Sequence, residues 1–322
     1  MKRGNILVLI ASAIYLFSFF ACTDNFMQEA TDHFGSGHDN GCHPKVLQNK
    51  PIISVDELQK VMKFDNVVVV DVRTVEEYDA GHIPGSINIP FVVPFSPWII
   101  SGDLLMELPP VEDLEAMLGA AGISNQSQVA LVTGIGQPPF PNAAGPRVAL
   151  TLHYLGLDAV SILDGGIDKW VAKGKPLTSV PTVLPETTFI ARPAQNLFVD
   201  INYVDASIGK KLILDGRDAE VYSGEVIEPW ALQPGHIPTA VSFPAISVWN
   251  ADGTYKTKSQ LDKIAKSVIG PGSKNREIVV YCGVGGYGSV LYYVLHDLLE
   301  YKNIKFYDGS AQEWSLLREM EL

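Results

Sequence analysis

A chain of 322 residues is about two domains long, and 47 % hydrophobic with 19 % charged residues describes a globular protein that can bury hydrophobic cores rather than a disordered one. The formal net charge of −12 argues against a nucleic-acid partner, because counterion release requires clustered Lys and Arg. The same negative charge disfavours binding of the protein to an anionic membrane surface.

The N-terminus is predicted to be an export signal. Lys2 and Arg3 precede an apolar stretch, residues 6–20, that is too short for a comfortable membrane span. The segment Ser18-Phe19-Phe20-Ala21-Cys22 resembles a bacterial lipobox, because a small residue precedes a cysteine directly after that stretch, although its two Phe depart from the usual Leu and small residue. We predict a signal peptide at 1–21 and a lipid anchor on Cys22, with a plain signal peptide or a single anchor helix as alternatives. Each reading places the protein outside the cytoplasm, in the periplasm or on the outer face of a bacterial membrane.

The next segment, residues 22–50, shows no apolar periodicity and is predicted to be a polar tether. Four of its residues have side chains that suit zinc or copper: His33, His38, Cys42 and His43. Since no paired ligand spacing supports a metal site, a solvated linker is predicted and metal binding is the alternative. Cys42 could also pair with Cys282 in an oxidising compartment, which would silence that thiol.

Apolar runs alternate with helical patterns along the rest of the chain. Ser54-Val55-Asp56-Glu57 is typical of a capping box, while continuous β-branched or apolar runs indicate buried strands. In chain order we predict a helix from 54, a strand at 67–70, a helix at 111–119, a strand at 129–132, a helix including 148–155, a strand at 160–163, a helix near Trp170, a strand at 211–214, a helix near Leu261, a strand at 278–281, a helix at 289–299, a strand at 304–307 and a helix near Trp314. Buried strands separated by helices predict an α/β fold of mostly parallel sheets covered by helices on both faces.

The motifs of the first half of this region recur in the second half, in largely the same order. The matching segments are Asp71-Val72-Arg73 with Asp215-Gly216-Arg217, Gly81-His82-Ile83-Pro84 with Gly235-His236-Ile237-Pro238, Thr133-Gly134-Ile135-Gly136 with Cys282-Gly283-Val284-Gly285, Asp164-Gly165-Gly166 with Asp308-Gly309-Ser310, and Trp170 with Trp314. We therefore predict two copies of one domain, at 51–175 and 200–322, joined by a linker at 176–199.

These motifs identify a family resemblance. From residue 52 on, the chain resembles a tandem rhodanese, the sulfurtransferase family with two homologous α/β domains. The motifs that carry it are Asp-x-Arg followed by Glu77-Tyr78, Gly-His-Ile-Pro, an Asp-Gly-Gly…Trp ending and a cysteine loop of the form C-x-x-G-x-x. A threonine hydroxyl cannot carry a sulfane sulfur, so Thr133 predicts a silent N-terminal domain that forms half of a cleft, and the resemblance implies the same division of labour.

Cys282 is the predicted nucleophile, because it ends an apolar strand and begins a glycine-rich stretch that leads into a helix. Glycines in this loop allow the backbone N–H groups to point inward, which should lower the pKa of the thiol and cradle a persulfide. The alternative is a buried, inert cysteine. The predicted binding residues of the loop are Gly283, Val284, Gly285, Gly286 and Tyr287.

Arg217 matches the family arginine that contacts the anionic sulfur donor, and a planar guanidinium suits sulfonate or carboxylate oxygens. Its alternative role is an ion pair with a carboxylate such as Glu220 or Glu225. For Arg73, the equivalent in the first copy, the structural role is predicted. His82 and His236 are predicted to be satisfied turn histidines, since both copies have the residue and only one has the nucleophile.

The donor stays open between thiosulfate and 3-mercaptopyruvate. Thiosulfate-using members typically have basic residues after the cysteine, and mercaptopyruvate-using members have a Gly-Ser-Gly-Val-Thr loop, whereas this chain has Val284 and Tyr287. Tyr287 either donates a hydrogen bond into the cleft or packs against Tyr292 and Tyr293. We predict transfer of a sulfane sulfur through a persulfide on Cys282 to a thiol or cyanide, with no metal and no organic cofactor.

Three other functions are weighed against this one. A cysteine-dependent phosphatase or arsenate reductase needs an arginine six residues after the cysteine, and Gly288 stands there. A lipid-anchored persulfide carrier would use the same cysteine without turnover. A pseudoenzyme that scaffolds a complex is disfavoured by the cysteine and its glycines in one loop.

Overall fold

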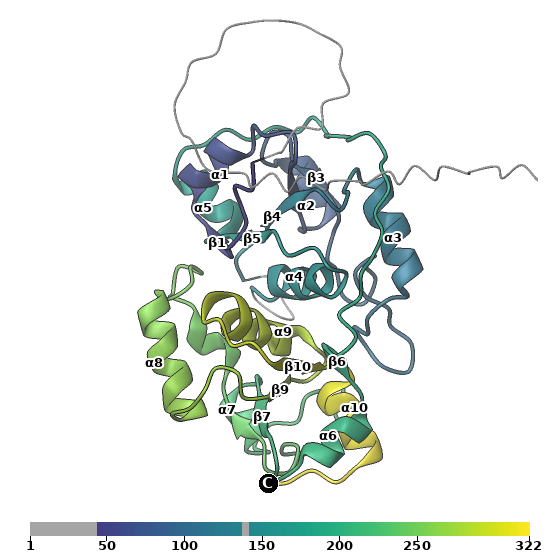
Figure 1. Cartoon of the computed structure of the whole chain (residues 1–322), viewed down its shortest axis with the longest axis vertical. Coiled ribbons are helices and arrows are strands. Elements are labelled where there is room, and N and C mark those ends of the chain that lie inside the picture. The colour runs from purple at the N-terminus through teal and green to yellow at the C-terminus, as the bar shows by residue number, and fades with distance from the viewer. Residues whose placement is uncertain (1–43, 137–141) are drawn as a thin grey trace, which may run out of the picture. The chain divides into compact units, whose positions relative to one another are not determined.

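The computed structural model describes residues 44–136 and 142–322, in which two five-stranded sheets are formed, both entirely parallel (Figure 1). Their strand orders are β1-β5-β4-β2-β3 and β6-β10-β9-β7-β8, so each strand of the first sheet has a counterpart at the same place in the second. Both sheets belong to one unit, residues 43–322. The α/β fold class with two parallel-sheet domains is confirmed.

The elements of the first sheet and its helices lie between residues 52 and 172. They are β1 Ile52–Ile53, α1 Val55–Val61, β2 Val67–Asp71, α2 Val75–Ala80, β3 Ile87–Asn88, α3 Val111–Ala120, β4 Gln128–Val132, α4 Ala144–Tyr154, β5 Val160–Leu163 and α5 Gly166–Ala172. The predicted capping box is present, because Ser54 Oγ accepts from the Glu57 N–H and the Glu57 side chain accepts from the Ser54 N–H.

The elements of the second sheet follow the same sequence of strands and helices. They are β6 Phe198–Val199, α6 Ile201–Ser207, β7 Leu212–Asp215, α7 Ala219–Tyr222, β8 Val241–Ser242, the 3-10 helix η1 Ala245–Val248, α8 Lys258–Ile269, β9 Ile278–Tyr281, α9 Gly286–Tyr293, the π-helix η2 Val294–Leu298, β10 Ile304–Tyr307 and α10 Ser310–Leu317.

The predicted elements are all found, with two differences. The helix predicted at 289–299 begins earlier, at Gly286, and its last part is the π-helix η2. The edge strands β1, β3, β6 and β8 and the helices α2, α6, α7 and η1 were not predicted. Each of these strands has two residues, which is too short to show a periodicity.

Alternate residues of each strand pack on opposite faces of the sheet, which is why the strands read as continuous apolar runs. In β2, Val67 and Val69 face the cluster formed with α1 and α5, and Val68 and Val70 face α3 and α4. In the second sheet α6 and α10 cover one face, and α8 and α9 cover the other. The α3/α4 side and the α8/α9 side form one continuous hydrophobic cluster, so the two domains share a core.

Helices α4 and α9 pack against each other where the two domains meet (Figure 1). Two contacts related by the repeat flank them. Asp308 Oδ2 accepts from the Leu108 N–H at 2.7 Å, and its counterpart Asp164 Oδ1 accepts from the Tyr255 N–H at 2.9 Å. The Asp of each Asp-Gly motif therefore binds the backbone of the other domain.

One buried ion pair also crosses this interface. The Arg147 guanidinium on α4 is fully buried and lies 2.6 Å from Asp308 Oδ1, which follows β10. Arg147 also donates to the Met106 carbonyl at 2.6 Å. Since a buried charge is costly without its partner, this pair holds the two domains in one arrangement.

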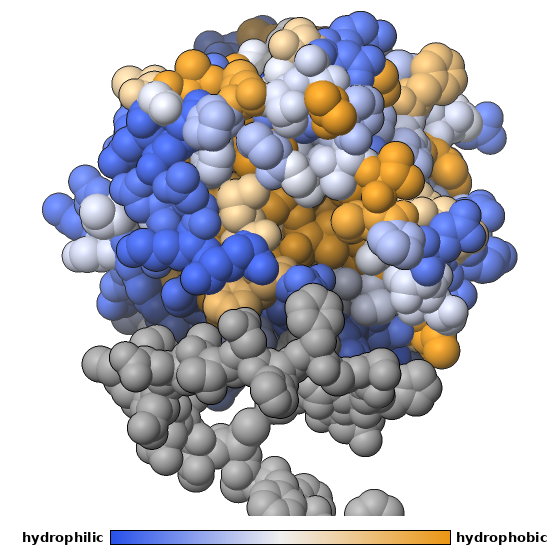
Figure 2. Space-filling view, turned by 90° about the horizontal axis from the view of Figure 1, so that it is seen from above, coloured by the Kyte–Doolittle hydropathy of each residue, from blue (hydrophilic) through white to orange (hydrophobic). Residues whose placement is uncertain are grey.

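The outer face of the N-terminal half mixes polar and hydrophobic side chains (Figure 2). Val180 and Val183 in the connection between the sheets are among the exposed large hydrophobic residues, at 71 % and 88 %. None of the helices in residues 44–136 and 142–322 combines the length and the apolar character that a membrane crossing requires. The predicted signal peptide and most of the tether lie outside the described residues.

We expect Arg147→Met to lower the free energy of unfolding by about 3–5 kcal/mol, because it leaves Asp308 buried beside Glu107 without a cation. Urea denaturation followed by fluorescence measures this change. Lys258→Met, which breaks the exposed pair with Glu300, is the control and should leave the midpoint nearly unchanged. Equal stabilities of the two variants would show that the interface does not depend on the buried pair.

Candidate active site

Cys282 lies directly after β9, a central strand of the second sheet, and its side chain is 1 % exposed with a free thiol. The Gly285 N–H donates to Sγ at 3.2 Å, and the N–H groups of Val284 and Gly288 also point at the sulfur. Gly285 has a φ of +92°, and a Cβ there would come within 3.0 Å of Arg147. The predicted inward-facing loop is therefore present, closed by a residue that only glycine suits.

Parallel strands bring the Asp-x-Arg motif to this loop. β7 pairs with β9 in a register that puts Asp215 beside Tyr281, the residue before Cys282. The Tyr281 hydroxyl donates to Asp215 Oδ2 at 2.6 Å. Motifs 66 residues apart in the sequence thus meet at the carboxyl edge of the sheet, where open parallel sheets hold their sites.

Arg217 is 2 % exposed and is held as part of the structure. Its Nε and Nη2 donate to Asp215 at 2.6–3.0 Å, and Nη2 also donates to the Gly235 carbonyl at 2.8 Å. The alternative role, a structural ion pair, is present, but the partner is Asp215 rather than Glu220 or Glu225. Contact between Arg217 and a donor stays a prediction. The Nη1 atom of Arg217 lies 3.9 Å from Glu228 Oε2.

Glu228 and Trp230 pack against the cysteine loop. Neither residue was predicted from the sequence to belong to the site. Glu228 Oε2 accepts from Trp230 Nε1–H at 3.0 Å, and a Cβ on Gly283 would lie 2.4 Å from both atoms. Burial raises the pKa of Glu228 to about 7, although Arg217 acts to lower it.

A signal for these two residues exists in the sequence. Asp71 and Asp215 are 144 positions apart, but Gly81 and Gly235 are 154 apart, so the second copy carries ten additional residues between the two motifs. Glu228 and Trp230 lie in this insertion, which only the copy with the cysteine has.

The predicted lowering of the Cys282 pKa is wrong. Burial, together with the carboxylate of Glu228, raises the pKa of the thiol to about 11, although the N–H groups of Gly288, Val284 and Gly285 act to lower it. The loop amides stabilise the thiolate as expected, but the loss of water around a fully buried sulfur outweighs them.

The two side chains that distinguish this loop both pack on the main hydrophobic core, but they are buried to different extents. Val284 is 1 % exposed and is part of the main hydrophobic core. Its side chain therefore faces the core, and only its backbone can make the predicted contact with a substrate. Tyr287 is half-buried and packs against the same core, and burial raises its pKa to about 12, with Cys282 and Glu228 among the charges that act on it.

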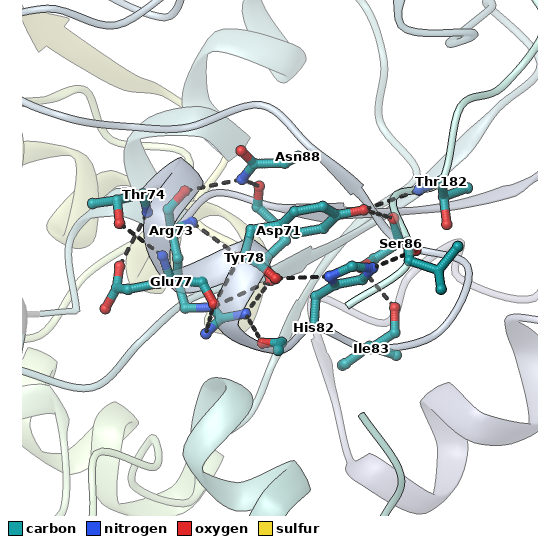
Figure 3. Close-up of polar contacts among 12 residues, drawn as sticks. Asp71, Arg73, Thr74, Glu77, Tyr78, His82, Ile83, Ser86, Asn88 and Thr182 are labelled. Carbon is teal, nitrogen blue, oxygen red and sulfur yellow. Dashed lines mark hydrogen bonds and ion pairs between the residues drawn. The ribbon is translucent and has the colours of Figure 1, made fainter. Parts of the chain in front are cut away.

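In the first copy, the side chains of the motifs bind one another and nearby backbone groups (Figure 3). Arg73 binds Asp71 at 2.6 Å and the Gly81 carbonyl at 2.9 Å, which confirms its structural role. His82 stacks on Tyr78 at 3.6 Å, and its ring nitrogens lie 2.7 and 3.1 Å from the carbonyl oxygens of Tyr78 and Val180.

His236 repeats this arrangement in the second copy. It stacks on Tyr222 at 3.9 Å and places Nδ1 3.0 Å from the Tyr222 carbonyl oxygen. Both histidines are therefore satisfied turn residues, as predicted.

Thr133 occupies the position of Cys282 in the first sheet. It follows β4, and its carbonyl accepts from the Ile167 N–H, just as the Cys282 carbonyl accepts from the Ala311 N–H. The two positions thus make the same backbone contact to the following helix, and one of them has a threonine where the other has the cysteine.

Comparison with known proteins agrees with these features. The Rhodanese-like domain family matches residues 54–173 and 200–317. The chain belongs to the rhodanese family and is a rhodanese-type sulfurtransferase.

Three similar proteins illustrate the relationship. The chain is 32 % identical to a "Putative thiosulfate sulfurtransferase" of Mycobacterium leprae, over 84 % of this chain and 97 % of that protein. It is 31 % identical to the "Sulfur carrier protein TtuD" of Thermus thermophilus, over 85 % and 95 %. Among solved structures, SseA from Escherichia coli, a 3-mercaptopyruvate sulfurtransferase, superposes with a TM-score of 0.69 at 26 % identity, over 81 % of this chain and 98 % of that one.

We expect Glu228→Gln to lower the pKa of the Cys282 thiol by on the order of one unit, because the substitution removes a negative charge that opposes the thiolate. The rate of alkylation by iodoacetamide as a function of pH measures this pKa. The native rate should rise about tenfold per pH unit between pH 7 and 9, since the thiol is mostly protonated there.

Glu225→Gln is the matched control, because Glu225 is an exposed carboxylate of the same inserted segment. Its alkylation profile should coincide with that of the native protein. An unchanged profile for Glu228→Gln would show that Glu228 does not act on the sulfur.

Proposed function

We propose that the protein moves a sulfane sulfur from a small anionic donor, thiosulfate or 3-mercaptopyruvate, to a thiol or cyanide acceptor through a persulfide on Cys282. The observation that carries this proposal is the convergence of three backbone N–H groups on the Cys282 sulfur. Such a ring of donors stabilises negative charge on sulfur, both in the thiolate and in a persulfide anion.

In the loading step the Cys282 thiolate forms a bond to the outer sulfur of the donor. With thiosulfate, the sulfur–sulfur bond of the donor breaks and its electron pair leaves with sulfite. With 3-mercaptopyruvate, the carbon–sulfur bond breaks, and the methylene carbon takes that electron pair and the proton of the donor thiol, giving pyruvate. In the second step the acceptor attacks the outer sulfur of the persulfide, and the bond's electrons return to Cys282 as a thiolate.

Loading depends on the protonation states of two groups, Cys282 and Glu228, because both set the charge around the sulfur. The Cys282 thiol must lose its proton, and its pKa of about 11 favours this at high pH. Glu228, whose pKa is about 7, repels an anionic donor when ionised and ceases to do so when protonated. Because the thiol must be ionised and the carboxyl protonated, the product of the two populations is greatest, and nearly level, between about pH 7 and about pH 11.

Treatment of the full chain with thiosulfate, or separately with 3-mercaptopyruvate, should add the mass of one sulfur atom to the peptide that contains Cys282, and cyanide should remove it. Intact-protein and peptide mass spectrometry measure the change. Cys282→Ser is the control and should gain nothing. The absence of added sulfur on the native peptide with both donors would refute the persulfide.

A persulfide carrier without turnover is the second candidate, and the similarity to a sulfur carrier protein of Thermus thermophilus favours it. It would use the same cysteine and the same loop. Steady-state production of thiocyanate or of pyruvate separates the two functions, since a carrier loads once and does not cycle without its partner.

We further propose that the protein is exported and held at a bacterial membrane by lipid on Cys22, with the catalytic unit on the periplasmic or outer side. Support comes from the charged start, the apolar stretch and the small residue before Cys22. Labelling of cells with a radioactive fatty acid should mark the native chain and leave Cys22→Ser unlabelled. A labelled Cys22→Ser chain, or an unlabelled native chain, would contradict the anchor.

A further inference from the structure

A cluster of two histidines and one aspartate lies at the domain interface, outside the cysteine site. His153 is in the last turn of α4, and His296 and Asp297 are consecutive residues of the π-helix η2. One donor atom from each residue can be chosen so that all three lie within 4.8 Å of one another. The cluster thus joins the N-terminal domain to the C-terminal domain.

Two atoms of this cluster face each other without a hydrogen bond. His153 Nδ1 lies 3.6 Å from Asp297 Oδ2, which is too long for a hydrogen bond, and neither atom has another partner in the described part of the chain. His153 is only 8 % exposed. An unpartnered buried polar atom is costly, so two such atoms 3.6 Å apart favour the binding of a group that contacts both.

The chemistry of the two atoms indicates what can bridge them. An imidazole nitrogen that carries no proton and a carboxylate oxygen each offer a lone pair to a cation.

The spacing of the donor atoms suits a small transition-metal ion. Zinc binds His nitrogen and carboxylate oxygen at about 2.0–2.2 Å, which separates tetrahedral ligands by about 3.3–3.6 Å. His153 Nδ1 and Asp297 Oδ2 are 3.6 Å apart, and His296 Nδ1 and Asp297 Oδ1 form a hydrogen bond of 3.2 Å, which an ion would replace. One donor atom of each residue lies within 4.8 Å of the other two, so the three side chains can reach one ion after rearrangement.

The surroundings orient the cluster and leave it accessible. The π-helical turn brings His296 and Asp297 to the same side, and such turns are frequent at functional sites. The His296 ring stacks on Tyr292 at 5.0 Å. A cavity of about 360 Å³ borders both histidines and Asp158, which provides room for a water molecule or a fourth ligand.

We propose that His153, His296 and Asp297 form a binding site for a divalent transition metal, with zinc as the ion that their nitrogen and oxygen donors fit, and that the bound ion links α4 to η2. Two histidines and one carboxylate with an open position form a recognised ligand set for such metals. The site is independent of sulfur transfer, because it shares no residue with the cysteine loop.

The test is metal binding by the full chain after removal of metal with a chelator. Since His33, His38, Cys42 and His43 could bind zinc on their own, the reference is a full chain with His33→Gln, His38→Gln, Cys42→Ser and His43→Gln. Equilibrium dialysis followed by metal analysis should find one zinc per reference chain. Adding His296→Gln should weaken binding at least tenfold, and Asp297→Asn should do the same.

Two controls match these variants. Lys302→Gln changes a residue that lines the same cavity without offering a ligand, and Cys282→Ser removes the catalytic thiol; both should retain the zinc. Cobalt in place of zinc should give visible d–d absorption without a thiolate charge-transfer band, since the site has no sulfur ligand. Zinc should also raise the unfolding temperature of the reference chain, and this shift should vanish in His296→Gln.

Loss of binding in the reference chain itself would overturn the proposal, because the zinc would then belong to the tether. Unchanged affinity in His296→Gln, which alters a partly exposed residue and should fold, would overturn it equally. A thiolate band in the cobalt spectrum of the reference chain would place the metal on Cys282 instead and refute the site.

Discussion

The buried ion pair between Arg147 and Asp308 is the contact on which the arrangement of this protein depends. Asp308 follows β10, next to the turn whose Ala311 N–H binds the Cys282 carbonyl, and Arg147 projects from α4 of the other domain. Arg147 also limits residue 285 to glycine, which in turn aims an N–H at the sulfur. One guanidinium therefore connects domain packing to the shape of the cysteine loop.

The duplication makes this interface nearly symmetric, while the two cysteine-loop positions differ. Asp164 and Asp308 each bind the backbone of the opposite domain, and α4 and α9 pack together at the centre. Against this common frame, Thr133 replaces the thiol and the first copy lacks the segment that carries Glu228 and Trp230. Cys282, Glu228 and Trp230 thus all belong to the C-terminal domain, while Arg147 of the N-terminal domain packs against Gly285 of the cysteine loop.

The environment of Cys282 balances opposing effects. Backbone N–H groups stabilise the thiolate, whereas burial and the carboxylate of Glu228 stabilise the thiol. A fully buried sulfur is protected from adventitious oxidants, because reactivity requires both thiolate character and access. Because the carboxylate of Glu228 is one of the groups that raise the pKa of Cys282, the inserted segment contributes to the electrostatic environment of the thiol.

Local patterns in the sequence were sufficient for the two α/β domains and the main strands, because buried strands, glycine turns and repeated motifs are visible in neighbouring residues. They also led to Cys282 as the predicted nucleophile. They were insufficient for the two-residue edge strands, which have no periodicity, and for Arg217, whose partner is the Asp215 of its own motif. The tertiary structure alone decided the direction of the shift in the thiol pKa and the contact of Glu228 with the cysteine loop. It also decided the ion pair of Arg147 and the approach of His153 to Asp297. Each depends on desolvation and on charges brought together from distant positions, and neither quantity exists until the chain has folded.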